Sequence, residues 1–282
     1  MIEHRRFGNL LPHLVLLIGV AIVAFPVYMA IIASTHDNSV IANGQMPLIP
    51  GSHAVENYWN TLVAGTGKTT REPVIGMMVN SLIMALGITI GKIAISIISA
   101  YAIVFFSFPF RMTAFWIIFV TLMLPVEVRI FPTYKIASDL GMLDSYPGLI
   151  LPLIASATAT LLFRQFFLTV PKELVEASKI DGAGPLRFFK DTLLPLSVTN
   201  IAALFVILFI YGWNQYLWPL LITTRDDMQT IVIGIKKIID VHDALTEWQV
   251  AMATAVLAML PPVAVVVLMQ RLFVKGLVET EK

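Results

Sequence analysis

The chain has 282 residues, of which 57% are hydrophobic and only 13% are charged. A soluble domain has about 45–50% apolar and about 25% charged residues, so a mean hydropathy of +0.83 excludes a disordered or an ordinary soluble protein. The net charge of +1 provides no basic surface for nucleic acid, and the absence of cysteine excludes disulfides and thiolate metal sites.

Six apolar runs follow one another along the chain, and each is long enough for a membrane-spanning helix of about 20 residues. The runs are residues 10–33, 74–106, 113–131, 148–167, 200–222 and 248–273. They are continuously apolar, whereas the strands of a membrane barrel alternate over about ten residues. We therefore predict an all-α polytopic membrane protein whose six transmembrane helices form a single domain over residues 1–282.

The distribution of Lys and Arg predicts the orientation of these spans. With the N-terminus inside, the inner segments hold eleven Lys and Arg residues and the outer segments hold six. Loops on the cytoplasmic side of a membrane carry the excess of positive charge. We therefore expect a multi-pass membrane protein with both termini in the cytoplasm.

Several polar residues within or near the spans are candidates for a translocation path, because polar groups are costly in lipid and usually face protein or water. They are Asn80, Ser81, Glu127, Arg129, Tyr211, Asn214 and Gln215. Arg129 suits an anionic substrate, since arginine binds phosphate well. The alternative is that Glu127 and Arg129 pair and hold helices together, and Tyr211 is equally compatible with an aromatic belt at the membrane interface. For Lys92 we expect a side chain that extends towards the cytoplasmic interface.

The cytoplasmic loop at residues 168–197 has the pattern of two short helices joined by a turn. Pro171 suits the start of a helix, and Glu173 and Glu176 lie in its first turns, where the helix dipole favours acids. Asp181-Gly182 is typical of the end of a helix. A second short helix is predicted over Pro185–Thr192.

The same loop resembles the EAA loop of ABC-importer permeases, whose pattern is E-A-A-x3-G-x9-I-x-L-P. Ser178 replaces the second alanine of that pattern, and Thr192 replaces its isoleucine. The residues that the resemblance assigns to coupling with an ATPase are Glu176, Ala177, Ser178, Asp181, Gly182, Ala183 and Pro195. A generic amphipathic loop that only links two spans is the alternative.

The resemblance extends from Asn80-Ser81 to the C-terminus and is strongest with the carbohydrate-uptake group of these permeases. The segment from Trp213 to Leu220 is similar to their W-N-x-[FY]-L-W-P-L motif. The block from Thr121 to Thr133 is similar to permeases of sn-glycerol-3-phosphate importers. This implies sn-glycerol-3-phosphate and glycerophosphodiesters as substrates, with a neutral sugar or oligosaccharide as the alternative.

The resemblance to type I ABC importers also implies a location in the bacterial inner membrane, the partners and the mechanism. The expected partners are a homologous second permease, two cytoplasmic ATPase subunits, a periplasmic substrate-binding protein and membrane lipid, with no nucleic acid. Closure of the ATPase dimer would drive alternating access of the spans through the loop at residues 168–197. ATP and Mg²⁺ would be bound by the ATPase subunits, so we expect no cofactor, metal or catalytic residue on this chain.

Three other functions are disfavoured, namely nucleotide binding, intramembrane catalysis and secondary transport. Residues 65–70 end like a Walker A loop, but Leu62 stands where that motif needs its first glycine. The chain also lacks the HExxH and G-x-S-x-G motifs of an intramembrane enzyme. A secondary transporter would show inverted repeats, and we see no convincing repeat between the two halves of the chain.

Overall fold

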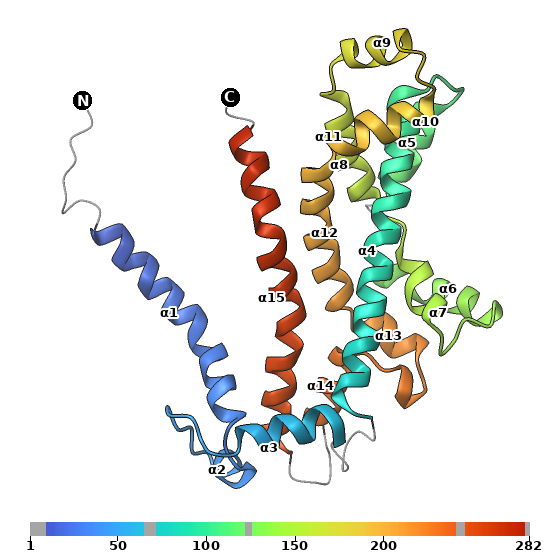
Figure 1. Ribbon diagram of the computed structural model, residues 1–282. Coiled ribbons are helices and arrows are strands. Elements are labelled where there is room, and N and C mark those ends of the chain that lie inside the picture. Colours follow the sequence, from blue (N-terminus) through green and yellow to red (C-terminus); the bar gives the residue numbers. More distant parts are fainter. Residues whose placement is uncertain (1–9, 65–71, 122–125, 241–245, 280–282) are drawn as a thin grey trace. The chain divides into compact units, whose positions relative to one another are not determined.

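The computed structural model describes residues 10–64, 72–121, 126–240 and 246–279, and every regular element in these ranges is a helix (Figure 1). Three helices are long and apolar enough to cross a membrane, within α1 (Leu10–Ala33), α4 (Val74–Phe105) and α15 (Trp248–Glu279). Two bent helix pairs, with angles of 49° and 70°, raise the number of candidate spans to five.

The helices expected from the sequence are continuous in three of the six runs and divided in the other three. The run at 113–131 is divided between α5 (Arg111–Val120) and α6 (Val126–Asp139). The run at 148–167 contains α7 (Tyr146–Ile150), a 3₁₀ turn at Leu151–Leu153 and α8 (Ala157–Leu168), and α8 begins where the Ser156 side chain accepts from the amide of Ala159. The run at 200–222 contains α12 (Val198–Trp213) and α13 (Leu217–Ile222). In the run at 148–167 the break has a local cause, because Pro152 lies in the 3₁₀ turn and the Ser156 side chain caps α8.

The chain divides into two compact units, which are described separately; the single domain remains a prediction. The first unit comprises the described residues of 1–77 and 233–260. It holds α1, α2 (Asn38–Ala42), α3 (Ala54–Trp59), a π-helical turn at Asn60–Ala64 and most of α14 (Ile231–Ile239). Side-chain hydrogen bonds connect α3 to the turn after α1, where the Asn57 amide donates to the carbonyls of Ser34 and His36, both at 2.9 Å.

The second unit comprises the described residues of 78–232 and 261–282 and contains both of the sites considered below. One apolar cluster lies where α4, α8 and α12 meet the loop at 168–197, and it includes Phe163, Phe167, Phe188 and Leu193. A second cluster joins α4 to α6, α7 and α13. The two clusters are built around different stretches of α4, so this helix connects the two ends of the unit (Figure 1).

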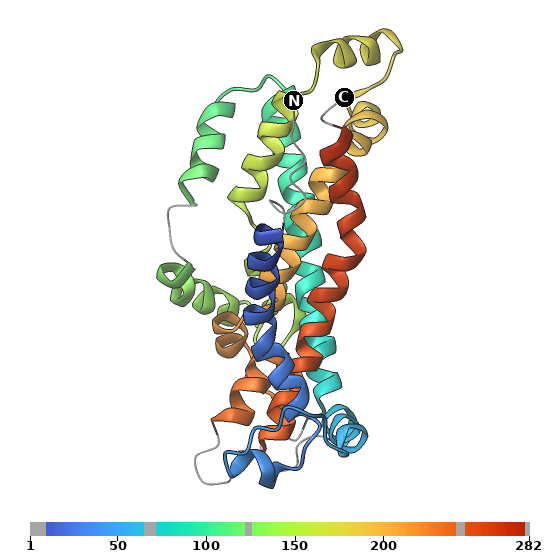
Figure 2. The same ribbon diagram turned by 90° about the vertical axis from the view of Figure 1, so that its left-hand side faces the viewer.

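Glycines allow close contact between α4 and its neighbours. A Cβ atom on Gly212 of α12 would lie 3.0 Å from the Cα atom of Ala85 of α4, and the two helices run side by side in Figures 1 and 2. A Cβ atom on Gly87 would lie 2.6 Å from the Ile150 side chain. Small residues at such contacts are characteristic of packed membrane helices.

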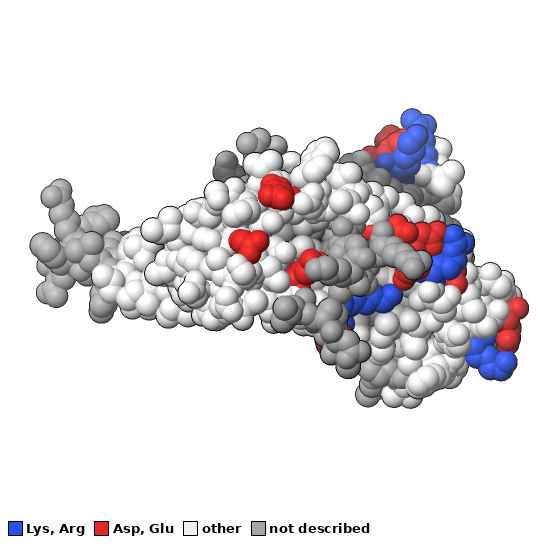
Figure 3. All heavy atoms as spheres, turned by 90° about the horizontal axis from the view of Figure 1, so that it is seen from below, with Lys and Arg blue, Asp and Glu red and all other residues white. Residues whose placement is uncertain are grey.

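Charged side chains are sparse on the face of the molecule drawn in Figure 3, where they occur in a few small groups separated by uncharged surface. Apolar side chains are also exposed along α1, including Leu17, Val23 and Leu16. A helix that is apolar on all sides is typical of a membrane span.

We predict that Gly148→Ala destabilises the protein, because the added Cβ atom would lie 2.0 Å from the backbone oxygen of Met142. Overpacking of this kind costs about 1–3 kcal/mol. The measurement is the thermal midpoint of the detergent-solubilised chain. Gly76→Ala is the matched control, since nothing lies within 4 Å of a Cβ atom at that position. Equal midpoints for the two variants would contradict the close contact.

Candidate coupling loop and translocation path

The first helix of the loop, α9 (Lys172–Ile180), ends in a glycine-dependent cap. Gly182 has a φ of +69°, in the left-handed region that favours glycine. Its amide donates to the carbonyl of Lys179 at 3.1 Å, and the amide of Ala183 donates to the carbonyl of Ser178 at 2.9 Å. These two bonds are the Schellman pattern, so the helix end predicted at Asp181-Gly182 is confirmed.

The second part of the loop is helical from Pro185 to Leu196, through α10 (Pro185–Phe188), a π-helical turn (Phe189–Leu193) and α11 (Leu194–Leu196). Its axis turns by 70° at the junction with α12. The predicted helix over Pro185–Thr192 is therefore confirmed, and it extends further than expected.

Aromatic contacts hold this second helical segment against the end of α4. The rings of Phe188 and Phe105 lie 5.5 Å apart, and those of Phe189 and Tyr101 lie 5.0 Å apart. The Tyr101 hydroxyl also donates to the carbonyl of Pro185 at 2.8 Å. Aromatic pairs contribute about 0.5–1.5 kcal/mol beyond the area they bury, so the loop is attached to the spans by several independent contacts.

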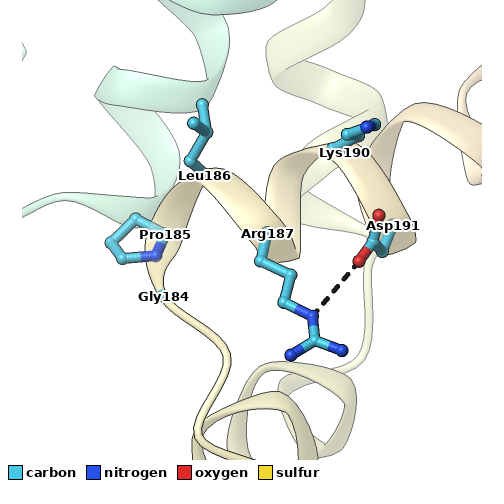
Figure 4. A pocket seen from close by; sticks show the side chains of 6 residues that line it. All are labelled: Gly184, Pro185, Leu186, Arg187, Lys190 and Asp191. Atoms are coloured by element: carbon cyan, nitrogen blue, oxygen red, sulfur yellow. Dashed lines mark hydrogen bonds and ion pairs between the residues drawn. The ribbon is translucent and has the colours of Figure 1, made fainter.

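The outer surface of the loop is exposed and carries apolar tips. Ile180 is 85% exposed and Leu186 is 80% exposed. A hollow of about 540 Å³ lies beside Leu186, and its rim carries the Arg187–Asp191 ion pair at 3.4 Å (Figure 4). Exposed apolar side chains next to charged ones are typical of a protein interaction site.

Six of the residues assigned to coupling lie in α9 and the turn that follows it, and Pro195 lies in α11. Glu176, Ala177, Asp181, Gly182 and Pro195 are exposed. Ser178 and Ala183 are half-buried and line a cavity of about 150 Å³ together with Tyr101 and Phe105 of α4. The assigned positions therefore include an outer surface and an inner surface that faces the spans.

A polar junction lies further along α4, about 30 Å from the loop at about 1.5 Å per residue. Asn80 is only 5% exposed, and its amide group donates to the carbonyls of Asp227 at 2.8 Å and Gln229 at 3.0 Å. Its carbonyl oxygen accepts from the Tyr146 hydroxyl at 2.7 Å. The neighbouring Ser81 hydroxyl oxygen accepts from the amide of Ile231 at 2.8 Å.

Asp144 extends this junction from the N-terminal side of α7. Its carboxylate accepts from the amide and hydroxyl of Thr224, both at 2.6 Å, and from the amide of Arg225 at 2.9 Å. Burial raises the pKa of Asp144, but these hydrogen bonds and the charge of Arg225 outweigh it and leave the pKa below its usual value. The ionised Asp144 carboxylate therefore stabilises the folded protein. This stabilisation is complete above the ordinary pKa of a carboxyl group and is lost as pH falls through the lowered pKa of Asp144.

Four of the seven predicted path residues fall into two pairs in the structure. Asn80 and Ser81 form the junction, where their hydrogen bonds hold the segment between α13 and α14. Tyr211 and Gln215 are half-buried near the end of α12, and the Gln215 amide donates to the carbonyl of Tyr211 at 3.2 Å. The others are found as follows: Asn214 is exposed at the end of α12, Arg129 is exposed in α6, and Glu127 lies in the first turn of α6 with its side chain outside the described part of the structure.

The expectation for Lys92 was wrong. Its side chain does not extend to the interface but is 7% exposed, with Nζ 3.9 Å from the ring centroid of Tyr211. The cation therefore stays between α4 and α12, where it contacts an aromatic face. The only signal in the sequence was a lysine far from both ends of a long apolar run.

The chain belongs to the family of binding-protein-dependent transport system inner membrane components, because the model of that family matches residues 81–279. It is a multi-pass membrane protein and a transport permease, and its all-α polytopic fold is confirmed. One solved structure, described as a bacterial ABC transporter involved in the import of the acidic polysaccharide alginate, has a TM-score of 0.81 at 18% identity. The match covers 96% of this chain and 98% of that chain and supports the fold alone.

Curated relatives match over the whole length of the chain. It is 60% identical to the sn-glycerol-3-phosphate transport system permease protein UgpE of Rhizobium meliloti (strain 1021). It is also 60% identical to the protein of the same name from Agrobacterium fabrum and 56% identical to that from Escherichia coli O157:H7. In all three cases the match covers 100% of this chain and 100% of the relative.

We predict that Asn80→Ala loosens the segment at 224–231 more than Ser81→Ala does. The first variant removes two donated bonds and one accepted bond, whereas the second removes one. Each buried group left unpaired costs about 1–3 kcal/mol. Amide hydrogen exchange of residues 224–231 measures the effect. Unchanged exchange in Asn80→Ala would contradict a structural role for this side chain.

Proposed function

We propose that this chain is one of two permease subunits of an ATP-driven importer for sn-glycerol-3-phosphate and glycerophosphodiesters. The observation that carries the proposal is full-length identity of 56–60% to permeases of sn-glycerol-3-phosphate transport systems. ATP and Mg²⁺ are bound by two separate cytoplasmic ATPase subunits, and this chain itself has no catalytic role. A periplasmic binding protein delivers the substrate, and both termini lie in the cytoplasm.

The loop at 168–197 is the proposed docking surface for an ATPase subunit. Its exposed apolar tips, Ile180 and Leu186, supply the contact, and its inner face is attached to α4 through Phe188 and Tyr101. A movement of the ATPase is therefore passed to α4 and α12 as a movement of packed side chains. This is the mechanical basis of alternating access in the proposal.

The uptake of a neutral sugar or oligosaccharide is the alternative function. It is favoured by the motif from Trp213 to Leu220, which resembles that of sugar permeases. In the structure Trp218 Nε1 donates to the carbonyl of Gly148 at 3.1 Å, and the Trp218 side chain is buried. This part of the motif therefore supports packing, which is compatible with either substrate.

We expect the complete complex in proteoliposomes to accumulate labelled sn-glycerol-3-phosphate only when ATP and the binding protein are present. Uptake is measured with and without ATP, and an excess of unlabelled neutral sugar serves as the competitor. Strong competition by the sugar would favour the alternative substrate. Uptake driven by an ion gradient without ATP would contradict an ABC importer.

We also predict that Gly182→Val uncouples ATP hydrolysis from uptake. A β-branched residue at a φ of +69° is strained by about 1–2 kcal/mol, and relief of that strain distorts the end of α9. Gly182→Asn is the matched control, since asparagine tolerates this conformation. The measurement is substrate imported per ATP hydrolysed. A normal ratio in Gly182→Val would contradict the coupling role of the turn.

A further inference from the structure

We propose that Lys92, with Tyr211 beside it and Arg129 nearby, forms the cationic site of the translocation path that binds the phosphate group of the substrate. This inference rests on the proposed function, because it requires a phosphate ester as the transported molecule. It assigns Lys92 a role in binding that the sequence pattern did not indicate.

The position of Lys92 is the first argument. It lies in the middle third of α4, a helix of 32 residues whose length of about 48 Å exceeds a hydrocarbon core about 30 Å thick. A charge at that depth is costly, and intramembrane lysines are usually paired or line the route of a substrate or ion. The Lys92 side chain is buried, so a role in pairing or in the route of a substrate is needed to compensate for the cost of its charge.

The surroundings of Lys92 are the second argument. The ring of Tyr211 holds the ammonium group at 3.9 Å, which fixes its position on the side of α4 that faces α12. The positive charge of Arg129 in α6 also acts on Lys92. Two cations from different helices that repel each other are both stabilised when an anion with two negative charges binds between them.

The chemistry of the two cations suits a phosphate monoester. Lysine binds phosphate as a point charge, and arginine binds it through a pair of parallel hydrogen bonds. A site of this composition favours a phosphate ester over a neutral sugar, which would leave both cations uncompensated.

The test is uptake of sn-glycerol-3-phosphate by the complete reconstituted complex carrying Lys92→Met. We expect uptake to fall at least tenfold while the complex assembles as the unsubstituted one does. Lys92→Arg should keep uptake within threefold of the unsubstituted chain. Lys135→Met, in an exposed ion pair of α6, is the control and should have no effect.

A chemical rescue separates loss of charge from loss of packing. The chain has no cysteine, so Lys92→Cys provides its only thiol. Aminoethylation of that thiol restores a positive charge and should restore uptake, whereas methylthiolation, which leaves the site neutral, should not. The unsubstituted complex treated with the same reagents controls for thiols of the other subunits.

Three results would overturn the inference. The first is normal uptake in an assembled Lys92→Met complex. The second is recovery of uptake in the double variant Lys92→Met, Glu127→Gln, which would make Lys92 a structural ion-pair partner. The third is failure of every neutral variant to assemble while Lys92→Arg assembles. If the unsubstituted complex imports no sn-glycerol-3-phosphate, the proposed function fails instead.

Discussion

The attachment of the loop at 168–197 to the end of α4 is the contact on which the proposed mechanism depends. Phe188 and Phe189 pack on Phe105 and Tyr101, and the Tyr101 hydroxyl bonds the backbone at Pro185. A loop held only by its two ends would absorb a push from a partner protein. A loop held through several aromatic contacts and a hydrogen bond moves together with the helices beneath it.

The second unit therefore has different chemistry at its two ends. Aromatic packing joins the loop to α4, whereas hydrogen bonds of Asn80, Ser81 and Asp144 hold the segment between α13 and α14. Lys92 lies between these regions, near the middle of the same helix, where it contacts α12 through Tyr211. A displacement of α4 by the loop would thus reach the cation and the polar junction along one continuous helix.

Local features of this fold could be predicted from the sequence, and long-range contacts could not. Continuous apolar runs located α1, α4 and α15, and Asp181-Gly182 located the end of α9, because both signals depend on neighbouring residues. The partners of Asn80 lie 147 and 149 residues away, and no local pattern indicates them. The expectation for Lys92 failed for the same reason, since the aromatic ring that holds it belongs to a distant helix.

Rigid attachment of the loop to the spans is tested most directly by a distance between spin labels. Because the chain contains no cysteine, Glu173→Cys in α9 and Ile98→Cys in α4 provide two unique and exposed labelling sites on it. The distance is measured by pulsed electron resonance in the assembled complex, without nucleotide and with ATP bound. The account predicts the same distance distribution in both states. A shift of several ångströms between the two states would show that the loop moves independently of α4 and would contradict the mechanism.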